Sequence, residues 1–104
     1  MTYDLPSPPE ATPMAGGFDS LDGVRTLIAY IDGTPKDAIR VSVQAGQFGD
    51  GRLEPKPINV GIDINDDGCE ITPEQCRELA TTLLAAADLA ATWKTWIPEW
   101  LPYV

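Results

Sequence analysis

The chain has 104 residues, enough for one domain with a modest core, and 43% of them are hydrophobic. Its 16 acidic and 7 basic residues give a net charge of −9, which repels nucleic acid phosphates and anionic lipid headgroups. No apolar run is long enough to span a membrane. We therefore expect neither nucleic acid nor membrane as a partner.

Residue types on which many enzymes rely are missing. The chain contains no histidine, which excludes Ser-His and Cys-His nucleophile pairs and zinc sites that need imidazole. Its two cysteines, Cys69 and Cys76, are too few for the disulfide framework of a small secreted protein, so we expect reduced thiols in the cytoplasm. Gly-rich phosphate-binding loops are absent. The sequence predicts a protein that is not an enzyme and needs no cofactor.

Residues 1–20 form a proline-rich segment with few large apolar side chains. The segment lacks the basic and apolar regions of a secretory signal peptide. It buries too little surface to offset its ordering entropy, so we predict a flexible N-terminal arm. We expect the folded domain over residues 21–92 and a separate tail over residues 93–104.

Three segments, residues 24–31, 38–44 and 58–64, read as strands. The second and third alternate between apolar and polar side chains, and the links are short, which favours a three-stranded antiparallel meander with one solvated face. The first is apolar on both faces: Val24, Ile28 and Tyr30 point one way, and Leu27, Ala29 and Ile31 the other. If a helix covers the first set, then Leu27 and Ile31 need another cover. The arm, the tail and self-association are the alternatives.

From Thr72 the apolar period changes from two to 3.6, which predicts an amphipathic helix. Thr72 and Gln75 fit a capping box, and Pro73 takes the favoured first helical position. The predicted inward stripe consists of Cys76, Leu79, Ala80, Leu83, Leu84, Ala87 and Ala91. The whole pattern predicts an α+β domain of the βββα type, with a core that includes Leu79, Leu83, Val41, Val43, Val60 and Ile62.

Residues 63–74, DINDDGCEITPE, match the calcium-loop pattern of EF-hands at every specified position. Asp63, Asn65, Asp67 and Glu74 would supply the hard oxygen ligands that calcium prefers. However, the pattern follows a strand instead of a helix, and the capping box starts the helix one residue before Glu74. We therefore interpret the segment as the polar turn between the last strand and the helix. A calcium site remains the alternative.

Residues 71–89, ITPEQCRELATTLLAAADL, resemble the "LTPEQARELAAALLAAAD" helix that ends many small uncharacterised domains of actinobacteria and their phages. Residues 41–52, VSVQAGQFGDGR, are similar to the hairpin of such domains. The resemblance covers roughly residues 38–92. It implies the fold and a source, with the host cytoplasm or a virion as the location, and it carries no catalytic residues.

The C-terminal tail is rich in aromatic residues. Continuing the helix at 100° per residue predicts a second stripe, opposite Cys76, Leu79 and Leu83, formed by Leu89, Trp93, Trp96 and Trp100. Pro98 lacks the N–H that would bond back to Lys94, so the helix should end near Trp96. Leu101 and Tyr103 add further apolar surface. Either this tail caps the open face of the sheet, or it docks on a protein partner.

The leading hypothesis is a small non-enzymatic interaction or assembly protein: an adaptor, a modulator of a host protein or a phage structural component. It would act through its tryptophan-rich tail and N-terminal arm, on a protein partner or on its own copies. A calcium-stabilised module using residues 63–74 is the alternative. A hydrolase using Asp67 and Glu70 ranks third, because an open, solvated turn does not shift carboxylate pKa values as catalysis requires.

Overall fold

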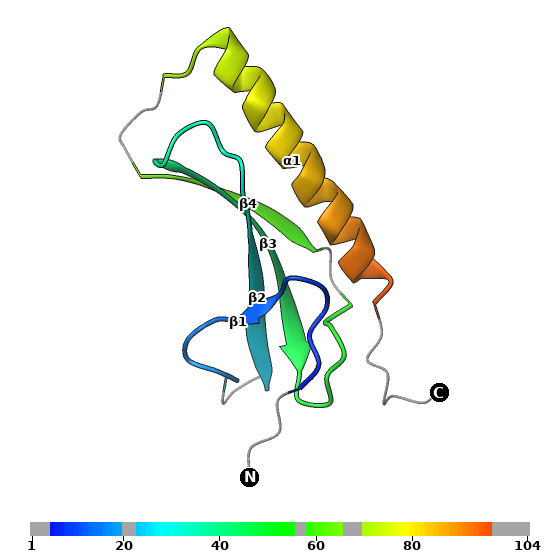
Figure 1. Cartoon of the computed structure of the whole chain (residues 1–104). Helices are drawn as coiled ribbons and strands as arrows, with labels where there is room; N and C mark the ends of the chain where they lie inside the picture. The colour runs from blue at the N-terminus through cyan, green and yellow to red at the C-terminus, as the bar shows by residue number, and fades with distance from the viewer. Residues whose placement is uncertain (1–4, 20–22, 56–57, 66–69, 97–104) are drawn as a thin grey trace.

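The computed structural model describes residues 5–19, 23–55, 58–65 and 70–96. Its elements are, in chain order, β1 (Thr12–Pro13), β2 (Val24–Ile31), β3 (Ile39–Phe48), β4 (Asn59–Ile64) and α1 (Pro73–Lys94). The strands form one antiparallel sheet in the order β1-β2-β3-β4, and α1 crosses one face of it (Figure 1). The α+β fold is confirmed, and the meander has four strands where the sequence predicted three.

The strand register decides which side chains lie beneath the helix. Ala29 of β2 pairs with Val43 of β3, and Val43 pairs with Val60 of β4. Because side chains alternate between faces, paired residues share a face. Leu27, Ala29 and Ile31 therefore lie on the same side as Val41 and Val43, and this is the side that α1 covers.

This arrangement corrects the predicted orientation of the first strand. The buried core consists of Leu27, Ala29, Val41, Val43, Ala86 and Trp93. Tyr30, expected on the helix side, instead lies on the opposite face and is 54% exposed, with the guanidinium of Arg40 5.5 Å from its ring centroid. Leu27 and Ile31 need no extra cover, because the helix itself covers them.

The described part of the N-terminal arm packs against the domain, so the prediction of a flexible arm is wrong for it. β1 pairs with the outer edge of β2, Thr12 opposite Ile28, and the Met14 N–H donates to the Thr26 carbonyl at 2.9 Å. Pro8 is fully buried. The composition argument failed because the arm does not fold alone: it gains its buried surface from the edge of a sheet formed later in the chain.

The helix begins as predicted. Thr72 is the N-cap, its hydroxyl accepts from the Gln75 N–H at 3.1 Å, and the Gln75 side chain accepts from the Thr72 N–H at 3.0 Å. Pro73 occupies the first turn. The helix ends at Lys94, with Thr95 as its C-cap, close to the predicted end.

The phase of the helix is rotated by about one residue, or about 100°, from the prediction. The residues turned inward are Gln75, Leu79, Thr82, Leu83, Ala86, Leu89, Ala90 and Trp93. Leu79 and Leu83 face the core as expected, whereas Cys76 and Leu84 are exposed. The rotation buries the large ring of Trp93, and the polar Thr82 can be buried because its hydroxyl is hydrogen-bonded to the Gly33 carbonyl at 3.0 Å.

Candidate protein-interaction surface

The predicted tryptophan stripe does not lie opposite the core. Trp93 is 0% exposed and belongs to the core with Leu27, and Leu89 packs at its margin. The Trp93 indole N–H donates to the Pro9 carbonyl at 2.9 Å, which ties the helix to the N-terminal arm. Trp96 is half-buried, and Trp100, Leu101 and Tyr103 lie outside the described residues. Trp93 and Leu27 are therefore structural residues in this fold and offer no surface to a partner.

Gln47 makes a second tie between the arm and the sheet, and the sequence pattern gave no sign of it. Its amide is fully buried, donates to the Pro6 carbonyl at 2.8 Å and to the Gly51 carbonyl at 2.9 Å, and accepts from Arg25 Nε at 2.7 Å. A glutamine in an alternating strand reads as a solvent-facing residue. Only its hydrogen-bond partners, which come from three separate segments, make its burial favourable.

The exposed apolar surface lies instead on β4. Val60, Ile62 and Ile64 share the helix-side face of the sheet, yet they are 40%, 52% and 50% exposed. Val60 and Ile62 were predicted in the core, and this is wrong because β4 is the last strand of the sheet and α1 lies mainly over β3, so the helix covers these side chains only in part. Isolated exposed apolar residues are common, but three in succession on one strand indicate a contact surface.

The outer backbone edge of β4 is also unpaired among the described residues, because β4 is the last strand in the sheet order. The direction of its backbone groups follows from one hydrogen bond: the Asn65 N–H donates to the Ala38 carbonyl at 2.9 Å. In an antiparallel pair, hydrogen-bonded and non-hydrogen-bonded positions alternate. Asn59, Gly61 and Asp63 therefore direct their N–H and C=O groups to β3. Val60, Ile62 and Ile64 direct theirs outward.

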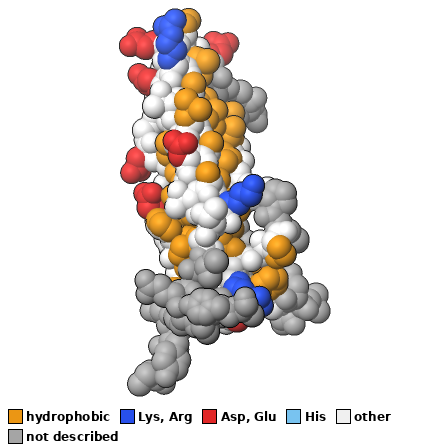
Figure 2. Space-filling model, turned by 90° about the vertical axis from the view of Figure 1, so that its right-hand side faces the viewer, with side chains coloured by type: hydrophobic (Ala, Val, Ile, Leu, Met, Phe, Trp, Pro, Cys, Tyr) orange, Lys and Arg blue, Asp and Glu red, His pale blue; other side chains and the backbone are white. Residues whose placement is uncertain are grey.

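One flank of α1 extends this apolar surface. Thr82 bonds the loop after β2 and Trp93 bonds the arm, so that flank of the helix faces β1 and β2. The opposite flank carries Ala80 and Ala87, both exposed. Leu84, which is 67% exposed, lies about 160° around the helix from the buried Ala86 and therefore points away from the sheet. Figure 2 views the molecule from the helix side and shows hydrophobic side chains along the helix, with most of the acidic side chains to their left. We call Val60, Ile62, Ile64, Ala80 and Ala87 the edge surface.

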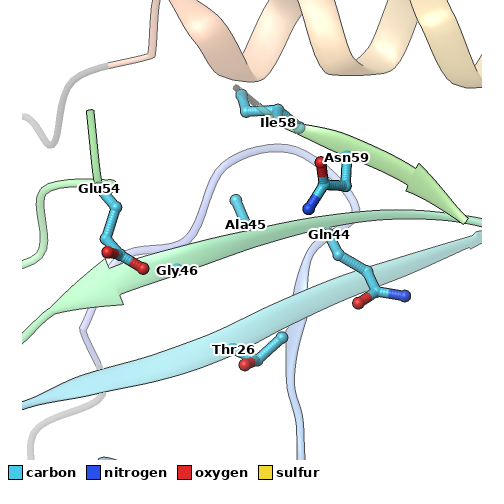
Figure 3. A pocket seen from close by; sticks show the side chains of 7 residues that line it. All are labelled: Thr26, Gln44, Ala45, Gly46, Glu54, Ile58 and Asn59. Atoms are coloured by element: carbon cyan, nitrogen blue, oxygen red, sulfur yellow. The ribbon is translucent and has the colours of Figure 1, made fainter. Parts of the chain in front are cut away.

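A shallow hollow of about 240 Å³ lies beside β3, and most of its lining is polar. Thr26, Gln44, Gly46 and Asn59 line it from the sheet, and the Glu54 side chain closes one end (Figure 3). Gly46 allows this approach, because a Cβ there would collide with the Glu54 carboxylate and lie 2.8 Å from Val24 Cγ1. The lining of the hollow contains one carboxylate, that of Glu54, and no cationic side chain.

The calcium-loop pattern cannot be traced in full, because residues 66–69, which include the candidate ligand Asp67, lie outside the described residues. Asp63 lies at the end of β4, Asn65 follows it, and Glu74 lies in the first turn of α1. The strand-then-helix context on which the turn interpretation rests is confirmed. In the described ranges, no three His, Cys, Asp or Glu side chains are grouped as a metal site would need. The absence of calcium binding stays a prediction.

One carboxyl has a clearly perturbed pKa. The Arg52 backbone N–H donates to Asp50 at 3.0 Å, and the Arg52 side chain donates at 2.8 Å; together they hold the pKa of Asp50 below its usual value. Both side chains are exposed in the loop between β3 and β4. The pair therefore links two neighbouring residues of this exposed loop.

Comparison with known proteins adds no identity. No family model, curated protein or solved structure matches the chain. In the part of the chain that the structure describes, no helix is long and apolar enough to cross a membrane.

Proposed function

We propose that the protein is a small non-enzymatic interaction protein that binds a protein strand along the free edge of β4. The observation that carries this proposal is that one strand has both outward-directed backbone groups and exposed apolar side chains. β4 has outward-directed backbone N–H and C=O groups, and the side chains of the same three residues, Val60, Ile62 and Ile64, are exposed and apolar.

Strand addition uses both features at once. An extended partner segment gains main-chain hydrogen bonds from the edge, and its alternate side chains gain apolar contacts with the same face. Natural sheets protect such edges with charges, prolines or bulges. β4 has one charged side chain, Asp63, and it points to the opposite face from Val60 and Ile62. The edge is thus poorly protected against pairing, as a binding edge should be.

The helix supports the same surface. Ala80 and Ala87 are exposed and small, so a partner can approach this flank of α1 closely. A segment added to β4 would therefore contact the helix as well as the strand. This role replaces the tryptophan tail as the proposed contact, and it keeps the expected class of function, a protein that acts by binding other protein chains.

Site-specific photocrosslinking in the source cells tests the proposal. A photoreactive phenylalanine analogue at Ile64 should give discrete protein adducts, identified by mass spectrometry. The matched control is the same analogue at Tyr30, which is exposed to a similar degree on the opposite face of the sheet. Equal adducts at both positions, or none at Ile64, would show that the edge surface is not a binding site.

A further inference from the structure

The backbone and side chains of the edge surface indicate which strand it binds. We infer that the strand it takes is β4 of a second copy of this chain, paired antiparallel about a two-fold axis at Ile62. This inference rests on the proposed function, because it uses the same edge. It adds the identity of the partner, the register and the arrangement of the helices.

The hydrogen-bonding phase permits this pairing. The outward-directed residues are Val60, Ile62 and Ile64, so an added strand must place its own bonding residues opposite them. With Ile62 opposite its copy, Val60 lies opposite Ile64 of the second copy, and Ile64 lies opposite Val60. All three outward-directed residues then form hydrogen-bonded pairs, each exchanging two bonds, for about six bonds across the seam.

The charge of Asp63 favours this register over the others that keep the same residues hydrogen-bonded. With the axis at Ile62, Asp63 lies opposite Gly61 of the second copy, so no like charges are opposed. Moving the pairing so that Ile62 lies opposite Ile64 places Asp63 directly opposite its own copy, which is destabilising. Moving it the other way pairs Ile64 with Ile58, which lies outside β4. The sequence V-G-I-D-I is thus self-complementary in one register.

The same axis brings the rest of the edge surface together. A two-fold axis perpendicular to the sheet keeps both α1 helices on the same face of a continuous eight-stranded sheet. If each helix lies above its own β3, three strand spacings separate the helix axes by about 14 Å. A helix with its side chains is roughly 10–12 Å across, so the helix flanks that carry Ala80 and Ala87 approach one another above the seam. Val60, Ile62 and Ile64 of both copies form the floor beneath them.

Net charge sets a distinctive salt dependence. Each chain carries −9, so two copies repel one another over distances longer than the seam, while the seam itself is apolar and hydrogen-bonded. Added salt screens the repulsion and leaves the contacts in place. The dimer should therefore become tighter as salt is raised, the opposite of an association driven by ion pairs.

Sedimentation velocity over a hundredfold range of protein concentration tests the inference. The wild-type chain should form a dimer whose dissociation constant falls as salt is raised from about 0.05 to about 0.5 M. Ile62→Lys places two ammonium groups opposite one another and should weaken the dimer about tenfold or more. Tyr30→Lys adds the same charge on the opposite face and should leave it unchanged. Circular dichroism confirms that both variants are folded.

Disulfide trapping then tests the register. In a chain carrying Cys69→Ala and Cys76→Ser, Ile62→Cys should form an intermolecular disulfide on mild oxidation. Its paired Cα atoms would lie about 5.5 Å apart, within the range that a disulfide needs. Asp63→Cys, opposite glycine, should trap far less.

The outcomes separate the two proposals. A wild-type chain that stays monomeric, or equal trapping at residues 62 and 63, overturns the self-pairing. If the analogue at Ile64 nevertheless crosslinks to another protein, the proposed strand-binding function stands. If neither self-adducts nor other adducts form at Ile64, the proposed function fails as well.

Discussion

The outer edge of β2 and the outer edge of β4 bound the same sheet, yet they are covered in different ways. β1 pairs with β2, and the segment before it is held by Trp93 and Gln47. In the described residues, no strand pairs with the outer edge of β4, and α1 covers its face only in part. As a result Val43 is fully buried and its cross-strand partner Val60 is 40% exposed. Alternation specifies which face a side chain takes, and neighbouring elements decide whether that face is closed.

The largest loss of stability is expected from Trp93, the side chain that holds the N-terminal arm beside the outer edge of β2. Trp93→Ala removes a fully buried indole and its hydrogen bond to Pro9, and should lower the free energy of unfolding by about 3–5 kcal/mol. For a domain of this size that loss approaches the total stability. Urea unfolding followed by circular dichroism measures it. Leu84→Ala, on the exposed flank, is the control and should change stability by about 0.5 kcal/mol or less.

A matched pair of valines measures the difference between the two regions directly. Val43 and Val60 are opposite one another in the sheet, on the same face, and differ in burial and in strand position. Val43→Ala should cost about 2 kcal/mol, from two lost methyl groups and the cavity they leave. Val60→Ala should cost less than about 1 kcal/mol. Equal losses in urea unfolding at low protein concentration would show that β4 is covered in solution.

Substitution at the start of the helix should change stability without affecting either edge of the sheet. Thr72→Ala removes the N-cap oxygen that accepts the Gln75 N–H, and should lower stability by about 1 kcal/mol. Thr81→Ala provides the control, because its hydroxyl bonds back to the Arg77 carbonyl on the exposed side of the same helix. A loss from Thr81→Ala as large as that from Thr72→Ala would contradict the capping role.

The smallest effect on stability is expected from Asp50 and Arg52, in the loop between β3 and β4. Hydrogen bonds from the backbone and then the side chain of Arg52 lower the pKa of Asp50 below 3.8 in the folded state. The charged form is therefore favoured by folding. Its contribution to stability is present above pH 3.8 and is lost as the pH falls through the lowered folded pKa. An NMR titration of the Asp50 carboxyl should show the lowered pKa, and Arg52→Met should raise it only in part, because the backbone donor remains.

The candidate site could be predicted from the sequence only in part. The apolar residues of β4 are evident in the sequence, but the pattern placed Val60 and Ile62 in the core and Leu84 in the inward stripe of the helix, and all three are exposed. The missing information was the position of β4 at the end of the sheet order and the rotation of the helix. Trp93 was assigned to a partner for the converse reason: its stripe was placed opposite Leu79 and Leu83, whereas all three face the core.

Local chemistry along the chain determined the class of fold, the three longer strands, the capping box of Thr72 and Gln75 and the approximate end of the helix. These features depend on alternation, on turn residues and on hydrogen bonds between residues close in sequence. Tertiary structure alone decided the pairing of Thr12 and Pro13 with β2, the burial of Gln47 and Trp93, and the exposure of β4. Each of these depends on contacts between segments distant in sequence, such as the 84-residue separation between Pro9 and Trp93, which no local pattern encodes.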